Sequence, residues 1–167
     1  MEVMSSLLYT EPTDAYAVEY QNEREKPMPS KLHSRVQGNI YFELRTKYGS
    51  SYDPFQELSF ELTHGKPVPD VCILDKKKID FLRDEIKVKE NPLLVIEILS
   101  PRQSVDDIRD KIANIYFPSG VKSAWIVFPT LKIVSLAMPN GEYKTITEGV
   151  VKDLNLDISL DMKDIFK

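Results

Sequence analysis

Two acidic residues stand in apolar segments that have the length and composition of buried strands. Glu97 lies within residues 93–99, an apolar run that does not alternate with polar residues and is flanked by prolines. Asp70 lies 27 residues earlier in a similar run, residues 68–75. Such runs predict strands that are covered on both faces. An ionised carboxylate there needs a cation, a hydrogen-bond network or a raised pKa.

The strand period of two relates the directions of these two side chains. Residues two apart on a strand share a face, so Asp70 points with Cys72 and Glu97 points with Val95. If the strands are neighbours, one register brings both carboxylates within reach of a single ion. Hard divalent cations such as Mg²⁺ take carboxylate, water and phosphate oxygens. The same register also suits a structural acid pair that shares a proton. The sequence therefore predicts a metal site or a proton-sharing pair.

Length, charge and cysteine content narrow the classes of protein. The 167 residues predict one domain, residues 1–167, in which residues 1–18 form a partly ordered N-terminal segment. A net charge of −4 argues against nonspecific coating of DNA, although not against a local basic groove. A single cysteine, Cys72, excludes an intrachain disulfide and a multi-cysteine zinc site, and suits a reducing compartment. No secretion signal or membrane-spanning run is visible, so we expect a cytoplasmic protein.

Alternating strand and helix signals predict an α/β fold. We expect a short strand near residues 16–20, helices over residues 31–48 and 104–117, and a charged, exposed loop over residues 76–90. The Asn140-Gly141 pair predicts a hairpin, and the tail predicts a last strand and a helical turn. The predicted strands are residues 57–62, 68–75, 93–99, 124–128, 131–137 and 143–147.

The first predicted helix carries ionisable groups on its apolar side. Ser30 is placed to cap it, and Gly49 follows its last residue. At 100° per residue His33 falls inside the apolar stripe and Glu43 lies beside it. Two such groups on a buried face are unusual for a helix that only packs. The stripe consists of Leu32, Val36, Ile40 and Leu44.

Beyond these residues, the order and spacing of several motifs resemble a known family. The resemblance is to the bacterial Uma-two family, described as putative restriction endonucleases, and it covers about residues 19–166. It extends from the helix that begins with Pro29-Ser30 and His33 to the closing Asp164-Ile165-Phe166. The central motifs are Pro69-Asp70, Glu97-Ile98-Leu99-Ser100-Pro101, Asp107 with Lys111, and the segment from Gly120 to Val127.

The resemblance implies a fold and an activity. The fold is that of restriction endonucleases, a mixed β-sheet flanked by helices, here with additional C-terminal β-hairpins. The activity is that of a hydrolase, a metal-dependent endonuclease that cleaves phosphodiester bonds with Mg²⁺ or Mn²⁺. DNA, as a duplex, is the expected substrate in preference to RNA. We expect a homodimer, since two-fold pairing presents one site to each strand, and no association with a membrane.

By position, the resemblance also assigns roles within the predicted site. Asp70 and Glu97 match the metal-binding acids of a Pro-Asp…Glu-x-Lys motif. Leu99 stands where the broader nuclease pattern has its lysine, and Lys111 from the following helix matches the family's replacement. One departure is the spacing from Lys111 to Tyr116, which is one residue longer than the family's. This extra residue leaves the direction of Lys111 open.

Four further residues are candidates for the same site. Glu57 matches a recurrent family acid and is expected to complete the metal shell. His33 matches the family's first-helix histidine. Glu43, which lies beside the apolar stripe of the first helix, and Asp107, which matches the family motif together with Lys111, are candidate accessory residues.

Each candidate also has a purely structural interpretation. Asp70 follows a proline, where an aspartate often binds only the amides of a turn. Glu97 would then pair with a core arginine or lysine. Lys111 and Asp107 are four residues apart, the spacing of a surface ion pair on a helix. His33 would be a satisfied core histidine.

The remaining polar and aromatic residues are likewise open to structural readings. Glu57 would lie on a solvated strand face. The lysines between residues 76 and 89 fit a solvated loop better than a DNA-tracking one. Trp125 and Tyr116 are predicted to be core residues. The competing function is a catalytically inactive nuclease-like module that binds a protein or nucleic-acid partner, and the missing in-strand lysine favours it.

Overall fold

A mixed six-stranded sheet organises the chain in the computed structural model, which describes residues 27–167. The strand order is β1-β2-β3-β4-β5-β6, and only the β3–β4 pair is parallel. The strand predicted near residues 16–20 and the segment 1–18 lie outside the described residues. The strands are β1 (Tyr52–Gln56), β2 (Val71–Asp75), β3 (Leu94–Ile98), β4 (Ser123–Phe128), β5 (Ile133–Ala137) and β6 (Tyr143–Ile146).

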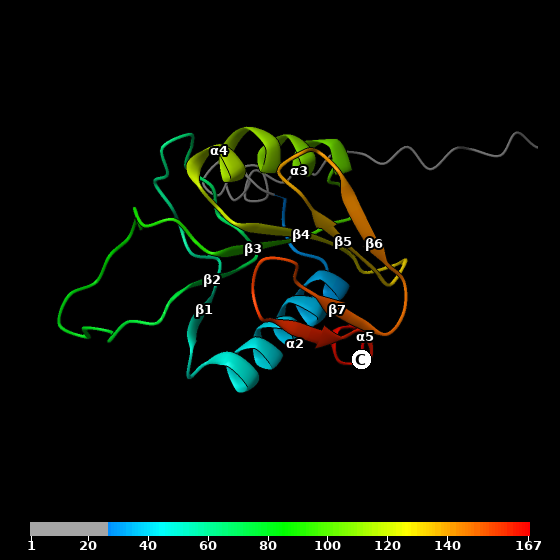
Figure 1. Ribbon diagram of the computed structural model, residues 1–167, viewed down its shortest axis with the longest axis horizontal. Helices are drawn as coiled ribbons and strands as arrows, with labels where there is room; N and C mark the ends of the chain where they lie inside the picture. Colours follow the sequence, from blue (N-terminus) through cyan, green and yellow to red (C-terminus); the bar gives the residue numbers. More distant parts are fainter. Residues whose placement is uncertain (1–26) are drawn as a thin grey trace, which may run out of the picture.

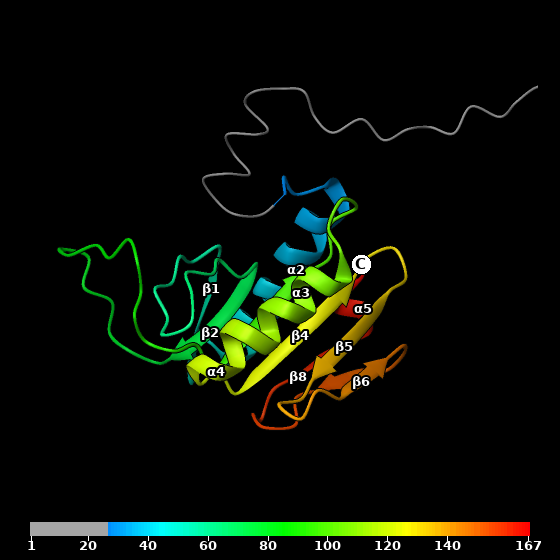
Figure 2. The same ribbon diagram turned by 90° about the horizontal axis from the view of Figure 1, so that it is seen from above.

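Helices cover both faces of this sheet, as predicted. Figure 1 shows α2 (Lys31–Tyr48) beneath the sheet and the helical segment from α3 (Val105–Lys111) to α4 (Phe117–Ser119) above it. Figure 2, seen from above, shows the α3–α4 segment running across the central strands. The second, two-stranded sheet and a terminal helix lie on the α2 side: β7 (Val150–Lys152), β8 (Ser159–Asp161) and α5 (Met162–Ile165).

The two faces bury separate apolar clusters because side chains alternate along each strand. Ile96 and Ile98 of β3 pack in the cluster that contains α2. Val95, whose side chain points to the opposite face of β3, packs in the cluster that contains Ile108 and Ile112. Burial of apolar side chains on both faces explains why β2 and β3 read as nearly continuous apolar runs.

The buried face of α2 differs from the predicted stripe at its first residue. Ser30 caps the helix by accepting a hydrogen bond from the backbone N–H of His33 over 3.1 Å, and Gly49 closes it. Leu32 was expected in the stripe but is 50% exposed. His33 and Gln37 are buried instead, because polar groups on the sheet side offer them partners. A helical wheel represents only the apolar periodicity of the helix itself and contains no information about partners on other elements.

The first strand lies before the predicted one. Residues 57–62 were expected to form it, but β1 ends at Gln56, and Phe60 and Leu62 make only isolated bridges, to Val88 and Gly65. Their alternation does reflect burial, since Phe60 and Leu62 are both buried. The edge of β2 is instead taken by β1, which contains Pro54. A proline is tolerated there because β1 is itself an edge strand.

The second helix contains a wide turn. A π-helical segment, η1 (Ile112–Tyr116), joins α3 to α4, and the backbone N–H of Phe117 donates to the carbonyl of Ile112, five residues earlier. The whole segment begins at the cap Ser104 and ends at Gly120, which adopts a left-handed φ of 102°. Its extent matches the predicted helix over residues 104–117. The described residues contain no helix with the length and apolar character needed to cross a membrane.

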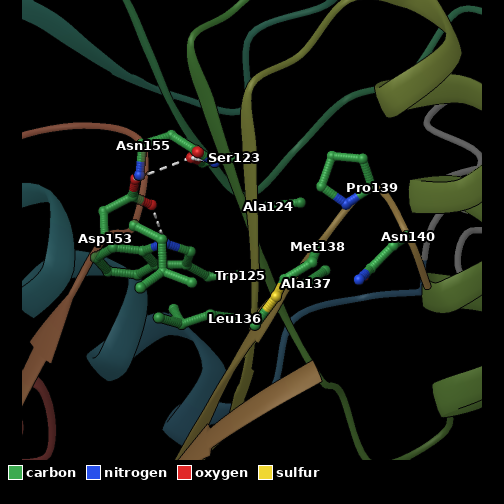
Figure 3. Close-up of a pocket in the computed structure, with 11 residues that line it drawn as sticks. Ser123, Ala124, Trp125, Leu136, Ala137, Met138, Pro139, Asn140, Asp153 and Asn155 are labelled. Carbon is green, nitrogen blue, oxygen red and sulfur yellow. Dashed lines mark hydrogen bonds between the residues drawn. The ribbon is translucent and has the colours of Figure 1, made fainter. Parts of the chain in front are cut away.

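A buried carboxylate ties the C-terminal segment to β4. Asp153 Oδ2 accepts from Trp125 Nε1 over 2.8 Å, and Oδ1 accepts from Ser123 Oγ over 2.9 Å. Oδ1 also accepts from the backbone N–H groups of Asn155 and Leu156. Figure 3 shows Ser123, Trp125, Asp153 and Asn155 beside a cavity at the start of β4. The cavity has a volume of about 360 Å³. Trp125 is fully buried, as predicted. The hydrogen bond to Asp153 satisfies the indole N–H, the only polar group of the Trp125 side chain.

Asp153→Ala is expected to destabilise the fold by about 3 kcal/mol, because several buried donors lose their acceptor together. Urea unfolding followed by tryptophan fluorescence measures this. Asp157→Ala is the matched control, since Asp157 is exposed on the same loop, and it should change stability by less than about 0.5 kcal/mol. Equal effects of the two substitutions would mean that the network is not stabilising.

Candidate active site

The two acids predicted from the strand runs lie across from each other where β2 begins and β3 ends. In the β2–β3 register Val71 pairs with Ile96 and Cys72 with Val95, so the next step outward places Asp70 opposite Glu97. Directly opposed residues of an antiparallel pair share a face, with Cβ atoms about 4.5–5.5 Å apart. Hence one register brings both carboxylates to the same end of the sheet.

Asp70 is buried and is bound from both the sheet and α2. Its Oδ2 atom accepts a hydrogen bond from the backbone N–H of Ile98 over 2.7 Å. The Nε2 atom of His33 lies 3.1 Å from the same oxygen. The partners of Asp70 thus include a strand amide and a helix side chain, and not only the amides of a turn. His33 is a neighbour of the acid pair rather than an isolated core histidine.

Glu97 is buried and is bound from the α3–α4 side. Lys111 Nζ lies 3.2 Å from Glu97 Oε1, and the hydroxyl of Tyr116 donates to that same oxygen over 2.5 Å. Burial and the negative charge of Glu97 raise the pKa of the Tyr116 phenol well above its usual value. The phenol therefore stays protonated and remains a donor. Lys111 pairs with Glu97. The surface-pair interpretation, which required Lys111 to pair with Asp107, is therefore wrong.

Glu57 joins the acid pair through the backbone and through Gln37. Its N–H donates to the carbonyl oxygen of Asp70, which extends the β1–β2 ladder by one residue. Gln37 Nε2 donates both to Glu57 Oε1 and to the Asp70 carbonyl oxygen, over 3.0 and 2.9 Å. Glu57 lies at a bend after β1, with a left-handed φ of 54°, and not within a strand as predicted. A non-glycine residue in this conformation is strained and ends the strand.

Tyr116 and Gln37 are the site neighbours that the sequence analysis missed. Tyr116 was assigned to the core, and it is indeed fully buried, but its hydroxyl binds a predicted site residue. The only signal in the sequence was the extra residue between Lys111 and Tyr116. Gln37 carried no signal beyond being polar next to the apolar Val36.

Two predicted accessory residues lie apart from this cluster. Asp107 is exposed in the first turn of α3. Glu43 is ten residues beyond His33 along α2, about 15 Å at the α-helical rise. Its carboxylate binds Lys47 over 2.9 Å and Lys167 over 3.2 Å. Glu43 is buried because α2 packs against the C-terminal residues, and its ion pairs satisfy it there.

Glu43→Gln is expected to lower stability by about 1 kcal/mol at pH 7, because its lysine partners are half exposed. The hydrogen bond from Lys47 and the charges of Lys47 and Lys167 hold the pKa of Glu43 below its usual value. A depressed pKa contributes stability that is present at neutral pH and is lost as the pH falls below about 4.5. Melting temperatures of both proteins should therefore converge between pH 5 and pH 3. A loss of Mn²⁺ binding in this variant would contradict its placement outside the site.

The basic loop lies at the other end of β2. Lys76 and Lys77 follow the last residue of that strand, whereas Asp70 precedes the first. Lys76 Nζ binds Asp53 over 2.7 Å, and Lys77 pairs with Glu90. These pairs, together with the exposure of the loop, favour the solvated-loop interpretation. The cavity beside Asp153 is also remote, because Ser123 is at the start of β4 and Glu97 at the end of its parallel neighbour β3.

The donor set suits a hard divalent cation bound by few protein ligands. Among residues 27–167, both hydrogen bonds of Glu97 end on Oε1, which leaves Oε2 for a further ligand. No group of three or more histidine, cysteine, aspartate or glutamate side chains in that part of the chain is close enough to hold an ion by itself. Mg²⁺ is typically bound by one or two carboxylates, with waters and substrate phosphates completing its shell. The residues present fit such an ion.

Comparison with known proteins places this chain in a family. The sequence model of the Uma2 family, described as "Putative restriction endonuclease", matches residues 6–160. A crystal structure described as "a putative nuclease belonging to DUF820", from Anabaena variabilis ATCC 29413, matches with a TM-score of 0.71 and 24% sequence identity. That match covers 84% of this chain and 83% of the other, and it confirms the predicted fold. No curated protein matches the chain.

The family match confirms the resemblance inferred from the motifs. It supports a nuclease, a hydrolase whose substrate is a nucleic acid, and restriction-endonuclease-like families typically depend on a metal ion. With nearly the whole described fold inside the matched range, the chain belongs to the Uma2 family of restriction-endonuclease-like proteins.

Proposed function

We propose that this protein is a Mg²⁺- or Mn²⁺-dependent endonuclease that hydrolyses phosphodiester bonds of double-stranded DNA. The observation that carries the proposal is the opposition of Asp70 and Glu97 at the end of the sheet, with Lys111 bound to Glu97. DNA is preferred over RNA because the family is described as one of restriction endonucleases. We further propose a cytoplasmic homodimer, in which each subunit presents one site to one strand.

The chain's own residues have distinct roles in this proposal. Asp70 and Glu97 hold the cation, and Glu57 contributes to its shell through water. When bound, the cation activates water and neutralises charge on the phosphoryl group. His33 holds the Asp70 carboxylate in place through Oδ2. Lys111 supplies a positive charge beside the acids, to stabilise the negative charge that develops on the phosphate.

Lys111 is accessible enough for this role. Its side chain is 19% exposed, while that of Glu97 is 2% exposed, so the lysine side chain reaches solvent and contacts the buried acid. A phosphate that approaches from solvent meets the lysine and the acids together. In an acidic protein, this local arrangement has to provide the attraction that the net charge of −4 does not.

The test is cleavage of supercoiled plasmid by the purified protein, with Mg²⁺, with Mn²⁺ and with a chelator. We expect nicked and linear products only when a divalent ion is present. An RNA duplex should be cleaved more slowly than a DNA duplex of the same length. Direct titration with Mn²⁺ measures binding apart from catalysis. Absence of both Mn²⁺ binding and cleavage would exclude the proposed activity.

A second candidate is a nuclease-like module that binds nucleic acid without cutting it. It is favoured by the internal partners of both acids, since Asp70 binds Ile98 and His33 while Glu97 binds Lys111 and Tyr116. Leu99 in place of the in-strand lysine also favours it. Metal-independent DNA binding that survives loss of both acids, without cleavage under any ion, would support this module.

A further inference from the structure

The π-helical turn between α3 and α4 lies directly beside the candidate site. Lys111 is the last residue of α3, and Tyr116 is the last residue of η1. Both side chains reach the same oxygen of Glu97. Rare π turns often occur at functional sites, and here two residues at its edges contact one buried acid.

Helix geometry explains why a π turn is needed for this contact. Lys111 and Tyr116 are five residues apart, and in an uninterrupted α-helix such residues point about 140° away from each other. A turn closed by an i to i+5 hydrogen bond holds one extra residue, so the fifth residue returns to the face of the first. The bond from Phe117 N–H to the Ile112 carbonyl is of this kind. Without it, only one of the two side chains could face Glu97.

The local sequence favours a wide turn at this point. Pro118 lies in the helical segment, directly after Phe117. Proline lacks an N–H, and its ring collides with the carbonyl four residues before it in a regular α-helix. A widened turn just before Pro118 moves that carbonyl, here of Asn114, away from the ring. The π turn is therefore explained by the chain itself.

We propose that Tyr116 is a positioning residue for the metal-binding carboxylate, and that the π turn serves to align it with Lys111. This inference rests on the proposed function, because it assigns Glu97 to the metal. Two donors on Oε1 fix the rotation of the carboxylate and direct Oε2 toward the ion. Groups that orient a ligand in this way usually contribute about 10–100-fold to metal affinity or activity.

The first test is Tyr116→Phe, which removes only the hydroxyl. We expect Mn²⁺ affinity, measured by electron paramagnetic resonance of the free ion, to fall about 10-fold or more. The maximal cleavage rate should fall with it, while the KM for DNA changes little because Tyr116 is fully buried. Tyr48→Phe is the matched control: its hydroxyl also exchanges hydrogen bonds, with the backbone of Ser159, and its loss should leave Mn²⁺ affinity unchanged.

The second test removes the extra residue. Asn114 is exposed within η1. Its deletion, combined with Pro118→Ala to remove the ring that would collide with a regular α turn, would convert the π turn to an α turn with Lys111 and Tyr116 four residues apart. Residues at that spacing also share a face. We therefore expect the deletion variant to unfold cooperatively and to bind Mn²⁺ within about threefold of the wild type, because the aligned contacts are the same. In the deletion variant, Tyr116→Phe should lower Mn²⁺ affinity by the same factor as it does in the wild type.

The outcomes separate this inference from the proposed function. If wild-type protein binds no Mn²⁺, the proposed function fails and the positioning role fails with it. If wild type binds Mn²⁺ and Tyr116→Phe binds it equally well, only the positioning role is overturned. A deletion variant that fails to fold, or that folds without binding Mn²⁺, contradicts the assigned purpose of the π turn.

Discussion

Asp70→Asn is expected to abolish cleavage, reducing the rate by about 10³-fold or more, and to remove measurable Mn²⁺ binding. A cation in a phosphodiesterase site stabilises transition-state charge by several kcal/mol, and about 4 kcal/mol corresponds to 10³-fold in rate. The amide has the shape of the carboxylate and retains an oxygen that can accept from the Ile98 N–H. It lacks the negative charge that holds a divalent ion.

The alanine variant at the same position separates loss of charge from loss of structure. Asp70→Ala leaves the buried Ile98 N–H without its side-chain acceptor and removes the partner of His33. A cost of about 1–3 kcal/mol in unfolding free energy follows from such an unsatisfied group. The asparagine variant should melt closer to the wild type than the alanine variant, although neither variant cuts DNA.

A control on the same strand tests whether the effect belongs to the site. Asp75 is the last residue of β2 and is exposed, so Asp75→Asn removes an equal charge at the opposite end. Its cleavage rate and Mn²⁺ affinity should match those of the wild type. Cleavage by Asp70→Asn at the wild-type rate would show that the opposed acids are a structural pair.

The acid pair was predictable because strand periodicity is a strong constraint. Asp70 and Glu97 interrupt apolar runs, and a period of two relates their directions without knowledge of the fold. The register between the strands was not predictable, since a shift of one residue would have sent the carboxylates to opposite faces. The family resemblance supplied what periodicity could not, namely that these strands are neighbours.

Other parts of the site depend on tertiary partners and could not be predicted locally. Residues 57–62 alternate as a strand does, yet the free edge of β2 is occupied by β1, so Glu57 ends at a bend. Glu43 shares the buried face of α2 with His33 but meets lysines there. Tyr116 satisfied every criterion for a core residue, and only the structure reveals what its hydroxyl binds. A helix wheel at 3.6 residues per turn cannot represent a π turn.

Lys111→Met is expected to reduce the cleavage rate by about 10²–10³-fold, the usual loss when one group that stabilises a developing negative charge is removed. Methionine preserves much of the apolar length of the side chain and removes the ammonium group. Mn²⁺ affinity should stay the same or rise, because the ammonium 3.2 Å from Glu97 Oε1 repels a second cation. A lower cleavage rate without any loss of Mn²⁺ affinity distinguishes this variant from the loss of a metal ligand.

Two further variants test whether Lys111 has this role. Lys111→Arg keeps the positive charge and should recover part of the rate, whereas Lys122→Met, at an exposed position just before β4, should cut at the wild-type rate. If Lys111 served only to neutralise Glu97, its replacement would lower stability and leave turnover intact. Tyr116 would still hold the carboxylate in that case, so retained cleavage by Lys111→Met would assign the phosphate-stabilising charge to another residue.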